Sequence, residues 1–235
     1  TEELNSQNNF YNFCKFDYFY LVKQYLMNHD FDINFKVKDT IDEVSYLVTP
    51  LLIAVSNDNY NIVELLLKHP NIDINFKVLS KNWENNTFKS NAIFHAILNN
   101  NVKMLKLLLT NEKINVNKKI ENITLEESET IYEINSILKE IVLNTEIDSI
   151  EFMKLLLSHQ NIDINMYDEY KVISNDKSNL IYNNTTILKD IIEIENIEML
   201  KLLLKHPKID VNIPLIFSDE KEKTIFTPLC YAISH

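Results

Sequence analysis

One segment of this chain recurs five times, and the recurrence limits what the chain can fold into. Its clearest copy joins the leucine-rich stretch 65–67 to the closing box Ile72-Asp73-Ile74-Asn75. The closing asparagines of the five copies are Asn34, Asn75, Asn117, Asn165 and Asn212, so the copies are spaced by 41 to 48 residues. Self-similarity at this period indicates stacked repeats, each of which buries its apolar face against its neighbours.

The second copy predicts two helices followed by an extended segment. Thr49 and Pro50 suit the N-cap and the first position of a short helix that reaches about Ser56. A second helix is expected over residues 60–68, because apolar side chains recur there at helical spacing. The alternation of apolar and polar residues at 72–76 then predicts a short extended segment.

These features resemble the ankyrin repeat. The opening Thr49-Pro50-Leu51 with Ala54, the leucines at 65–67 and the closing box at 72–75 match the family's opening, second helix and closing box in order. The opening returns at 227–232, and more loosely at 91–96, 136–138 and 186–188. The resemblance covers nearly the whole chain. It implies an α-rich repeat solenoid, in which stacked antiparallel helix pairs are joined by β-hairpin fingers.

The same resemblance predicts one domain over residues 1–235. The expected repeats span about residues 8–48, 49–90, 91–135, 136–185 and 186–226, with a partial repeat at 227–235. The last repeat is unfinished, so either the array continues beyond His235 or this open end docks on a partner or on another copy. The chain contains no glycine, and we therefore expect Asn or Asp wherever the backbone needs a positive φ. We interpret the high asparagine content as compositional drift.

The connections after the closing asparagines are longer than in the family. Apolar residues alternate with polar ones on both arms of these connections, which predicts elongated β-hairpins. The clearest arms are 33–37 with 44–48, and 211–217 with 223–226. The middle hairpins are expected to be longer and more polar.

Charge and composition exclude several classes of function. The net charge of −11 argues against nucleic acid, because phosphate binding needs Lys and Arg. This charge either keeps a long surface soluble or steers a basic protein towards it. No apolar run approaches about 18 residues, so no membrane span is expected. Cys14 and Cys230 occupy apolar positions at opposite ends of the array. We expect both to be buried and unpaired, which fits a cytoplasmic chain.

We expect no catalytic residue, no cofactor and no metal. Four histidines recur at equivalent positions: His29, His69, His159 and His206. Packed helices lie about 8–10 Å apart, too far for these rings to share a zinc ion. Each histidine is instead expected to hydrogen-bond the last carbonyls of its helix. The closing boxes lack the glycine and glutamate of a calcium loop. By resemblance to the family, their asparagines are candidate acceptors for hydroxylation.

The candidate partner-binding residues lie in the fingers. Trp83 lies in a polar loop, and six further aromatic residues lie on hairpin arms: Tyr46, Phe88, Tyr167, Tyr170, Tyr182 and Phe217. Interface hot spots are rich in Trp and Tyr, although cross-strand aromatic pairs also stabilise sheets, so packing is the alternative. The acidic finger at 121–133 adds Glu126, Glu127 and Glu129.

Together these features predict a non-catalytic scaffold that binds a protein or peptide, preferably a basic one, on a concave surface of fingers and first helices. A rigid array loses little ordering entropy when a partner docks. Two alternatives stay open. The chain could be the targeting arm of a longer multidomain enzyme or ubiquitin-ligase adaptor. It could also be a self-assembling structural module, a monomer or weak homo-oligomer that associates through its open C-terminal end.

Overall fold

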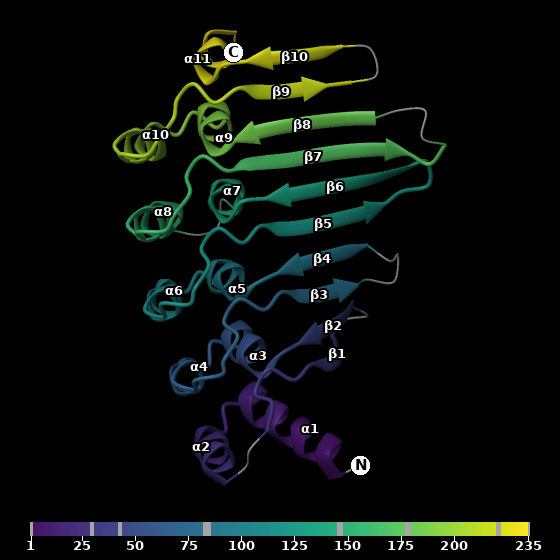
Figure 1. The fold of residues 1–235 in the computed structure, drawn as a ribbon, viewed down its shortest axis with the longest axis vertical. Helices are drawn as coiled ribbons and strands as arrows, with labels where there is room; N and C mark the ends of the chain where they lie inside the picture. Colours follow the sequence, from purple (N-terminus) through teal and green to yellow (C-terminus); the bar gives the residue numbers. More distant parts are fainter. Residues whose placement is uncertain are drawn as a thin grey trace. The chain divides into compact units, whose positions relative to one another are not determined.

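The structure is a computed structural model that describes residues 2–28, 31–41, 44–81, 86–144, 148–176, 180–219 and 222–234 (Figure 1). The helices are α1 (Glu2–Lys15), α2 (Phe19–Asn28), α3 (Pro50–Ser56), α4 (Tyr60–Leu67), α5 (Ala92–Leu98), α6 (Val102–Leu109), α7 (Ile137–Leu143), α8 (Ser149–Leu157), α9 (Ile187–Glu193), α10 (Ile197–Leu204) and α11 (Pro228–Ser234). The strands are β1 (Val37–Ile41), β2 (Val44–Val48), β3 (Val78–Lys81), β4 (Thr87–Ser90), β5 (Ile120–Leu125), β6 (Glu129–Asn135), β7 (Tyr167–Ser174), β8 (Leu180–Thr186), β9 (Leu215–Ser218) and β10 (Lys223–Phe226).

The expectation of an α-rich solenoid of helix pairs is wrong. Of the residues that the structure describes, 42% are helical and 25% lie in strands, and the ten strands belong to one antiparallel sheet in chain order. The hairpins are present as expected, but they are not isolated fingers, because neighbouring hairpins pair with one another. β2 pairs with β3, β6 with β7 and β8 with β9. The physical reason is that strands of a lone hairpin leave backbone N–H and C=O groups unpaired, and a neighbouring hairpin supplies the partners.

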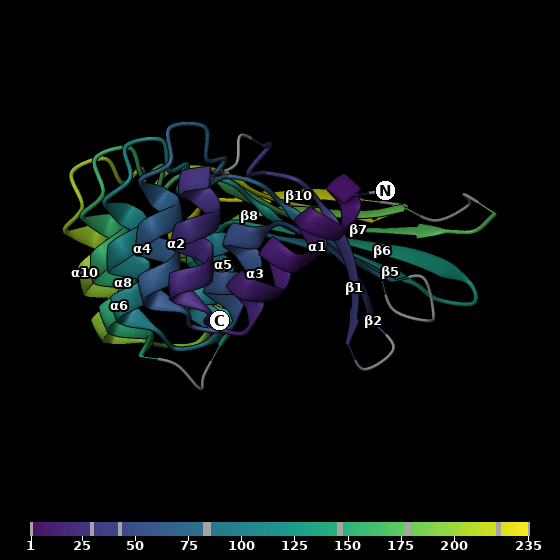
Figure 2. The same ribbon diagram turned by 90° about the horizontal axis from the view of Figure 1, so that it is seen from below.

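The chain divides into two compact units. The N-terminal unit comprises residues 1–83 and 89–114, and the C-terminal unit comprises residues 84–88 and 115–235. In each unit the odd-numbered helices, here called first helices, lie between the strands and the even-numbered second helices (Figures 1 and 2). First helices pack on one another in chain order, α1 on α3 and α3 on α5 in one unit, and α7 on α9 and α9 on α11 in the other.

The repeated leucines form the core of both units, as the periodicity predicts. Leu66, Leu108, Leu156 and Leu203 occupy the same place in successive copies, nine residues before the closing asparagine, and each is fully buried. Helix starts also follow the sequence. Thr49 Oγ1 accepts a hydrogen bond from Leu52 N at 3.4 Å, and Pro50 is the first residue of α3. No helix within the described ranges is long and apolar enough to cross a membrane.

In the turns between paired helices, residues other than glycine adopt a positive φ. Asp17, Asp58, Asn100 and Glu195 have φ between 50° and 58°. Asn and Asp tolerate this left-handed region better than other residues with a Cβ, so the first three confirm the expectation. Glu195 departs from the expectation, since it is neither Asn nor Asp and still has a positive φ.

The closing asparagines bridge successive repeats. The Asn34 side chain donates to Asn71 O at 2.7 Å and accepts from Asp73 N at 2.7 Å. The Asn165 side chain makes the same pair of bonds, to Lys208 O at 2.7 Å and from Asp210 N at 3.0 Å. Asn117 does so with Asn161 and Asp163. A primary amide can donate and accept at once, and this two-way bond fixes the spacing of adjacent closing boxes.

Asparagines at the opposite end of the helix pairs bridge repeats as well. Asn59 Nδ2 donates to Cys14 O at 2.7 Å, and Asn99 Nδ2 donates to Ser56 O at 2.8 Å. These bonds satisfy carbonyls at helix C-termini that lack an intrahelical partner. The interpretation of the asparagines as compositional drift therefore needs correction, since many of them cap and connect the repeats.

The recurring histidines lie at the ends of the second helices, but their bonds differ from the expectation. His69 Nδ1, His159 Nδ1 and His206 Nδ1 each accept a backbone N–H two residues further on, at 3.2 to 3.3 Å. The rings thus stabilise the following turn through an acceptor nitrogen, because that turn has amide groups that the helix cannot satisfy. His29 lies outside the described residues.

The two cysteines also differ from each other. Cys14 is buried and free, as predicted, whereas Cys230 is free and exposed. The reason is that α11 exposes the face that earlier first helices bury. Leu229 and Ile233 are 68% and 78% exposed, while their counterparts on α3, Leu51 and Val55, are 1% and 0% exposed.

Replacement of Asn165 by alanine should destabilise the C-terminal unit. The change removes both bridging bonds, and a typical hydrogen bond contributes about 0.5–1.5 kcal/mol, so we expect the free energy of unfolding to fall by about 1–2 kcal/mol. Urea denaturation measures this loss. Asn161→Ala is the matched control, because its side chain takes no part in the bridge and only its backbone oxygen does. Equal losses in the two variants would refute the bridging role.

Candidate functional site

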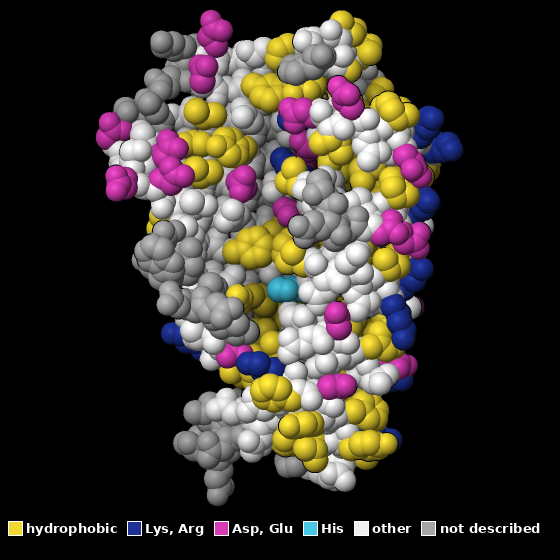
Figure 3. Space-filling model, turned by 180° about the vertical axis from the view of Figure 1, so that it is seen from behind, with side chains coloured by type: hydrophobic (Ala, Val, Ile, Leu, Met, Phe, Trp, Pro, Cys, Tyr) yellow, Lys and Arg dark blue, Asp and Glu magenta, His cyan; other side chains and the backbone are white. Residues whose placement is uncertain are grey.

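The candidate site lies where the hairpins face the first helices. Figure 3 shows a hollow between hairpins and helices in which hydrophobic side chains are visible, with acidic side chains beside it. Opposite residues of an antiparallel pair point to the same face of the sheet, and alternate residues along a strand point to opposite faces. The strand residues that face the helices therefore form one wall of the site in each unit, and the first helices form the other.

In the N-terminal unit this region contains a pocket of about 160 Å³. It is lined by Tyr11, Asp39, Tyr46, Val48, Ile53, Ser56, Asn57, Val78 and His95. These residues come from α1, the hairpin β1–β2, α3, β3 and α5. Most of the lining is aliphatic or aromatic, so the pocket offers an apolar interior with a few polar groups around it.

The acidic group of this pocket, Asp39, is already paired. Its Oδ2 accepts from Tyr11 OH at 2.7 Å and from Lys15 Nζ at 2.6 Å. Burial alone would raise the pKa of Asp39, but the bonds from Lys15 and Tyr11 outweigh it and hold the pKa below its ordinary value. The carboxylate therefore stays ionised, with its charge balanced by Lys15.

The imidazole of His95 is paired on both sides. Its Nδ1 lies 3.1 Å from Ser56 Oγ, and its Nε2 lies 2.9 Å from Ser90 Oγ. Burial lowers the pKa of His95 to about 4, because the charged ring would lose its hydration. The ring is neutral at physiological pH, and the pocket as a whole carries no unbalanced charge.

The C-terminal unit holds polar residues at the equivalent positions. The helix caps and closing asparagines align Thr49 with Ser136 and Asn75 with Asn165. In this alignment the pocket residues Asp39, Tyr46, Val48, Ile53, Val78 and His95 correspond to Asn122, Glu133, Asn135, Glu140, Asp168 and Asp190. The strand register agrees, since Asp39 lies opposite Tyr46 and Asn122 lies opposite Glu133. The same region of the repeat is thus mainly apolar in the N-terminal unit and mainly acidic in the C-terminal unit.

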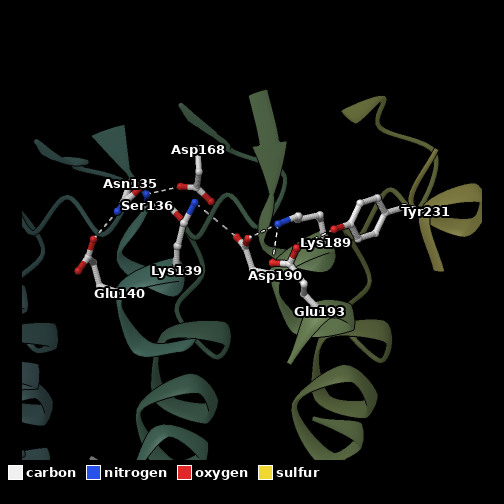
Figure 4. Close-up of polar contacts among 9 residues, drawn as sticks. All are labelled: Asn135, Ser136, Lys139, Glu140, Asp168, Lys189, Asp190, Glu193 and Tyr231. Atoms are coloured by element: carbon white, nitrogen blue, oxygen red, sulfur yellow. Dashed lines mark hydrogen bonds and ion pairs between the residues drawn. The ribbon is translucent and has the colours of Figure 1, made fainter. Parts of the chain in front are cut away.

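Figure 4 shows Glu140, Asp168 and Asp190 with their polar contacts, and the charge of Glu133 acts on Glu140. Lys139 Nζ lies 3.9 Å from Asp190 Oδ2, and Lys189 Nζ lies 3.7 Å from Asp190 Oδ1. Lys189 Nζ also lies 2.5 Å from Glu193 Oε2. We call Glu133, Glu140, Asp168, Asp190 and Glu193, with Lys139 and Lys189, the carboxylate cluster.

Three further groups hold the carboxylates of this cluster in place. The Asp168 carboxylate accepts the backbone N–H of Ser136, the N-cap residue of α7. Asn135 Nδ2 donates to Glu140 Oε1 at 2.8 Å, and Tyr231 OH donates to Glu193 Oε1 at 2.6 Å. The cluster is thereby connected to β6, to the start of α7 and to α11.

The cluster has more carboxylates than cations, and burial makes their charge costly. Asp168 and Asp190 are only 1% and 5% exposed. Burial raises the pKa of Asp168 to about 6, although the Ser136 N–H and Lys139 oppose it, and burial likewise raises the pKa values of Asp190 and Glu140. Within the described part of the chain, Asp168 Oδ2 and Asp190 Oδ2 are buried without a hydrogen-bond donor. Such oxygens are unusual in folded proteins, and an added cation or hydrogen-bond donor would stabilise them.

The cluster is not arranged as a metal centre. Among the residues with described positions, no group of three or more His, Cys, Asp or Glu side chains could hold a metal ion.

The structure separates the predicted aromatic residues by face. Tyr46 lines the pocket of the N-terminal unit. Phe217 stacks on Tyr231 at 6.1 Å between ring centroids, so its contacts are with the fold itself. Tyr170 lies opposite Glu133 and shares the helix-facing side of the sheet, whereas Tyr182 lies opposite Lys171 on the other side.

The remaining predicted aromatic residues have varied positions. Tyr167 OH donates to Pro214 O at 3.1 Å, which fixes one hairpin to the next. Phe88 lies in β4 and is half-buried. Trp83 lies outside the described residues.

The predicted acidic residues at the finger tip lie apart from the carboxylate cluster. Glu126 and Glu127 are exposed in the β5–β6 turn, and Glu129 begins β6. The turn is fixed to the next hairpin, because Asn175 N donates to Ser128 O and Asn175 Nδ2 donates to Glu127 O, both at 2.8 Å.

Sequence reasoning missed the carboxylate cluster. Glu140, Asp168 and Asp190 are scattered along the chain and look like ordinary surface charges. A signal was available in the repeat alignment, where Asp168 takes the place of Val78, Ile120 and Leu215, all of which are buried. A charge at a position that is otherwise buried and apolar deserves a functional explanation.

Comparison with known proteins gives a family match for one segment of the chain. Residues 46–76 match the family model of the ankyrin repeat. The match covers the end of β2, the pair α3–α4 and the closing box, and it supports an ankyrin repeat at this place. Such a repeat suggests a protein–protein interaction module, which is typically non-catalytic. The chain has no significant match to a curated protein.

Replacement of Asp168 by asparagine should stabilise the protein in a pH-dependent way. The pKa of Asp168 rises from 3.8 to about 6 on folding, so the carboxyl costs little below pH 3.8, destabilises the fold increasingly between pH 3.8 and 6, and has its full effect above pH 6. A shift of about two pKa units corresponds to about 3 kcal/mol. Asparagine keeps an oxygen that accepts from Ser136 N. We expect the free energy of unfolding of D168N to be about 2–3 kcal/mol higher than that of the unchanged protein at pH 7.5 and only about 1 kcal/mol higher at pH 4.5.

Urea denaturation at the two pH values measures this difference. Glu126→Gln, a change at an exposed carboxylate, serves as the control and should have little effect at either pH. A gain for D168N that does not vary with pH would show that the cost is steric and not one of charge.

Proposed function

We propose that this chain is an array of about five ankyrin-like repeats and a partial sixth, folded as one domain, that binds a basic protein or peptide without catalysing a reaction. The ankyrin-repeat match at 46–76 and the recurring order of helix, helix and hairpin support the array. A cytoplasmic location is part of the proposal and rests on the two free cysteines.

The observation that carries the basic partner is the carboxylate cluster. The raised pKa values of Asp168, Asp190 and Glu140 mean that the ionised forms of these three groups lack sufficient stabilisation in the free protein. A Lys or Arg side chain from a partner would bring both positive charge and N–H donors to Asp168 Oδ2 and Asp190 Oδ2. Arginine suits the position better, because its planar guanidinium can donate to two carboxylates at once.

Access to the cluster depends on its two lysines. The side chains of Lys139 and Lys189 are 17% and 13% exposed and pair with the buried Asp190, whereas the Glu193 side chain is 47% exposed. The ion pairs of Lys139 and Lys189 with Asp190 are 3.9 and 3.7 Å long, so a guanidinium that makes shorter bonds to Asp190 can replace these two pairs, while Lys189 keeps its 2.5 Å pair with Glu193. Glu193 then forms the entrance to the cluster.

The exposed glutamates of the finger tip have a different part in this proposal. Glu126 and Glu127 lie in solvent, where charges influence the rate of encounter more than the stability of the complex. Tyr170 shares the face of Glu133 and offers an aromatic contact beside the cluster.

The proposal is tested with immobilised nonapeptides of matched hydrophobicity that are basic, neutral or acidic. We expect the protein to retain basic peptides, with an affinity that falls as salt rises. Glu133→Gln with Glu140→Gln should weaken this binding by at least about tenfold, which corresponds to about 1.4 kcal/mol. Both changes keep an acceptor oxygen for the asparagines that bond to Glu133 and Glu140.

The matched control carries three glutamines at the finger tip, E126Q, E127Q and E129Q. It removes more charge than the test variant but should mainly slow association. If the control weakens equilibrium binding and the cluster variant does not, the binding surface is at the tip. Equal retention of acidic and basic peptides would refute a basic partner.

A second candidate, self-association, is favoured by the exposed face of α11. Leu229 and Ile233 lie one helical turn apart and are 68% and 78% exposed, and two such side chains on one face suit association with another copy. Sedimentation across protein concentrations should show a weak oligomer that Leu229→Ser with Ile233→Ser abolishes. Leu98→Ser, at another exposed leucine, should leave it intact. A strict monomer at high concentration would exclude this candidate.

A further inference from the structure

We infer that the pocket of the N-terminal unit is a binding site for one neutral aliphatic side chain, of the size of leucine. Its chemistry follows from the residues around it. Only the source of the side chain, a bound protein or peptide, rests on the proposed function.

The volume of the pocket limits the ligand. Sites for drug-sized molecules occupy about 300–1,000 Å³. The pocket measures about 160 Å³, which suits a branched group of a few heavy atoms and excludes a nucleotide or an extended cofactor.

The walls favour an apolar occupant. Val48, Ile53 and Val78 are 5%, 5% and 3% exposed and present methyl groups to the pocket. The rings of Tyr11 and Tyr46 complete the apolar lining. The Tyr11 hydroxyl bonds to Asp39, so its donor is used. A buried apolar pocket at a protein surface is the kind of feature into which an anchor side chain of a partner inserts.

The electrostatics exclude a cation as the best occupant. Asp39 is the pocket's acidic residue, and it already binds Lys15 Nζ at 2.6 Å, so a second ammonium would meet the charge of Lys15. His95 is neutral and has a serine hydroxyl within 3.1 Å of each ring nitrogen. The equivalent place in the C-terminal unit has the opposite character, because four carboxylates stand there in place of Tyr46, Ile53, Val78 and His95. The two sites therefore select different side chains.

Two small molecules with one carbon skeleton test this inference. The neutral probe is 3-methylbutan-1-ol, and the charged probe is 3-methylbutylammonium. Methyl NMR on the full chain reports binding through Val48, Ile53 and Val78. We expect the alcohol to shift these signals saturably, with an affinity at least about tenfold higher than that of the ammonium. Equal or tighter binding of the ammonium, or no saturable shift with the alcohol, would overturn the inference.

Two variants locate the binding in the pocket. Val78→Met adds side-chain volume and should reduce the affinity for the alcohol by at least about fivefold. Lys15→Met leaves Asp39 without its cation, and it should raise the affinity of the ammonium relative to the alcohol by a similar factor. Unchanged binding in both variants would place the probe elsewhere and refute the site. The signals of Val48, Ile53 and Val78 report on the pocket and not on the carboxylate cluster, so failure to bind basic peptides would refute the proposed function and leave this result untouched.

Discussion

The side-chain amide of asparagine is the interaction on which the rest of this structure depends. The chain has no glycine, so its turns and helix ends need another way to satisfy backbone groups. Three closing asparagines each donate to a carbonyl of the next repeat and accept from an amide of that next repeat as well: Asn34, Asn117 and Asn165. Because these bonds run in both directions, they fix the distance and register between neighbours. The strands of adjacent hairpins can then pair, and the first helices can pack in order.

This regular frame makes differences between repeats meaningful. The position held by Val78 in one unit is held by Asp168 in the other, and Ile53 is replaced in the same way by Glu140. The strand register is the same at both places, so side-chain chemistry is what distinguishes an apolar pocket from a cluster of carboxylates. Burial disfavours the charged form at both sites: it lowers the pKa of His95 to about 4, which keeps the ring neutral, and it raises the pKa of Asp168 to about 6. A repeat fold can therefore place two sets of side chains with different chemistry at equivalent positions without a change of architecture.

Much of the fold could be predicted from local patterns. Leucine periodicity predicted the paired helices, and alternation predicted the hairpins. The pairing of one hairpin with the next could not be predicted in this way, because it depends on hydrogen bonds between segments far apart in the sequence. The candidate site was harder to predict from the sequence than the fold. Tyr46 was predicted and lines a pocket, but Phe217 packs on Tyr231, and a ring on a hairpin looks the same in either role. Asp168 was missed, because its burial becomes visible only when its repeat is aligned with the others.

The central claim is that the carboxylate cluster is completed by a basic side chain of a partner, and the pKa of Asp168 tests it most directly. Carbon NMR of the Asp168 carboxyl group, recorded through a pH titration, gives this pKa in the free protein and in the protein saturated with an arginine-containing peptide. The account predicts a value of about 6 in the free protein, and a fall of at least about one unit in the complex, because the added cation stabilises the carboxylate. A peptide that binds tightly and leaves the Asp168 pKa unchanged would contradict the account.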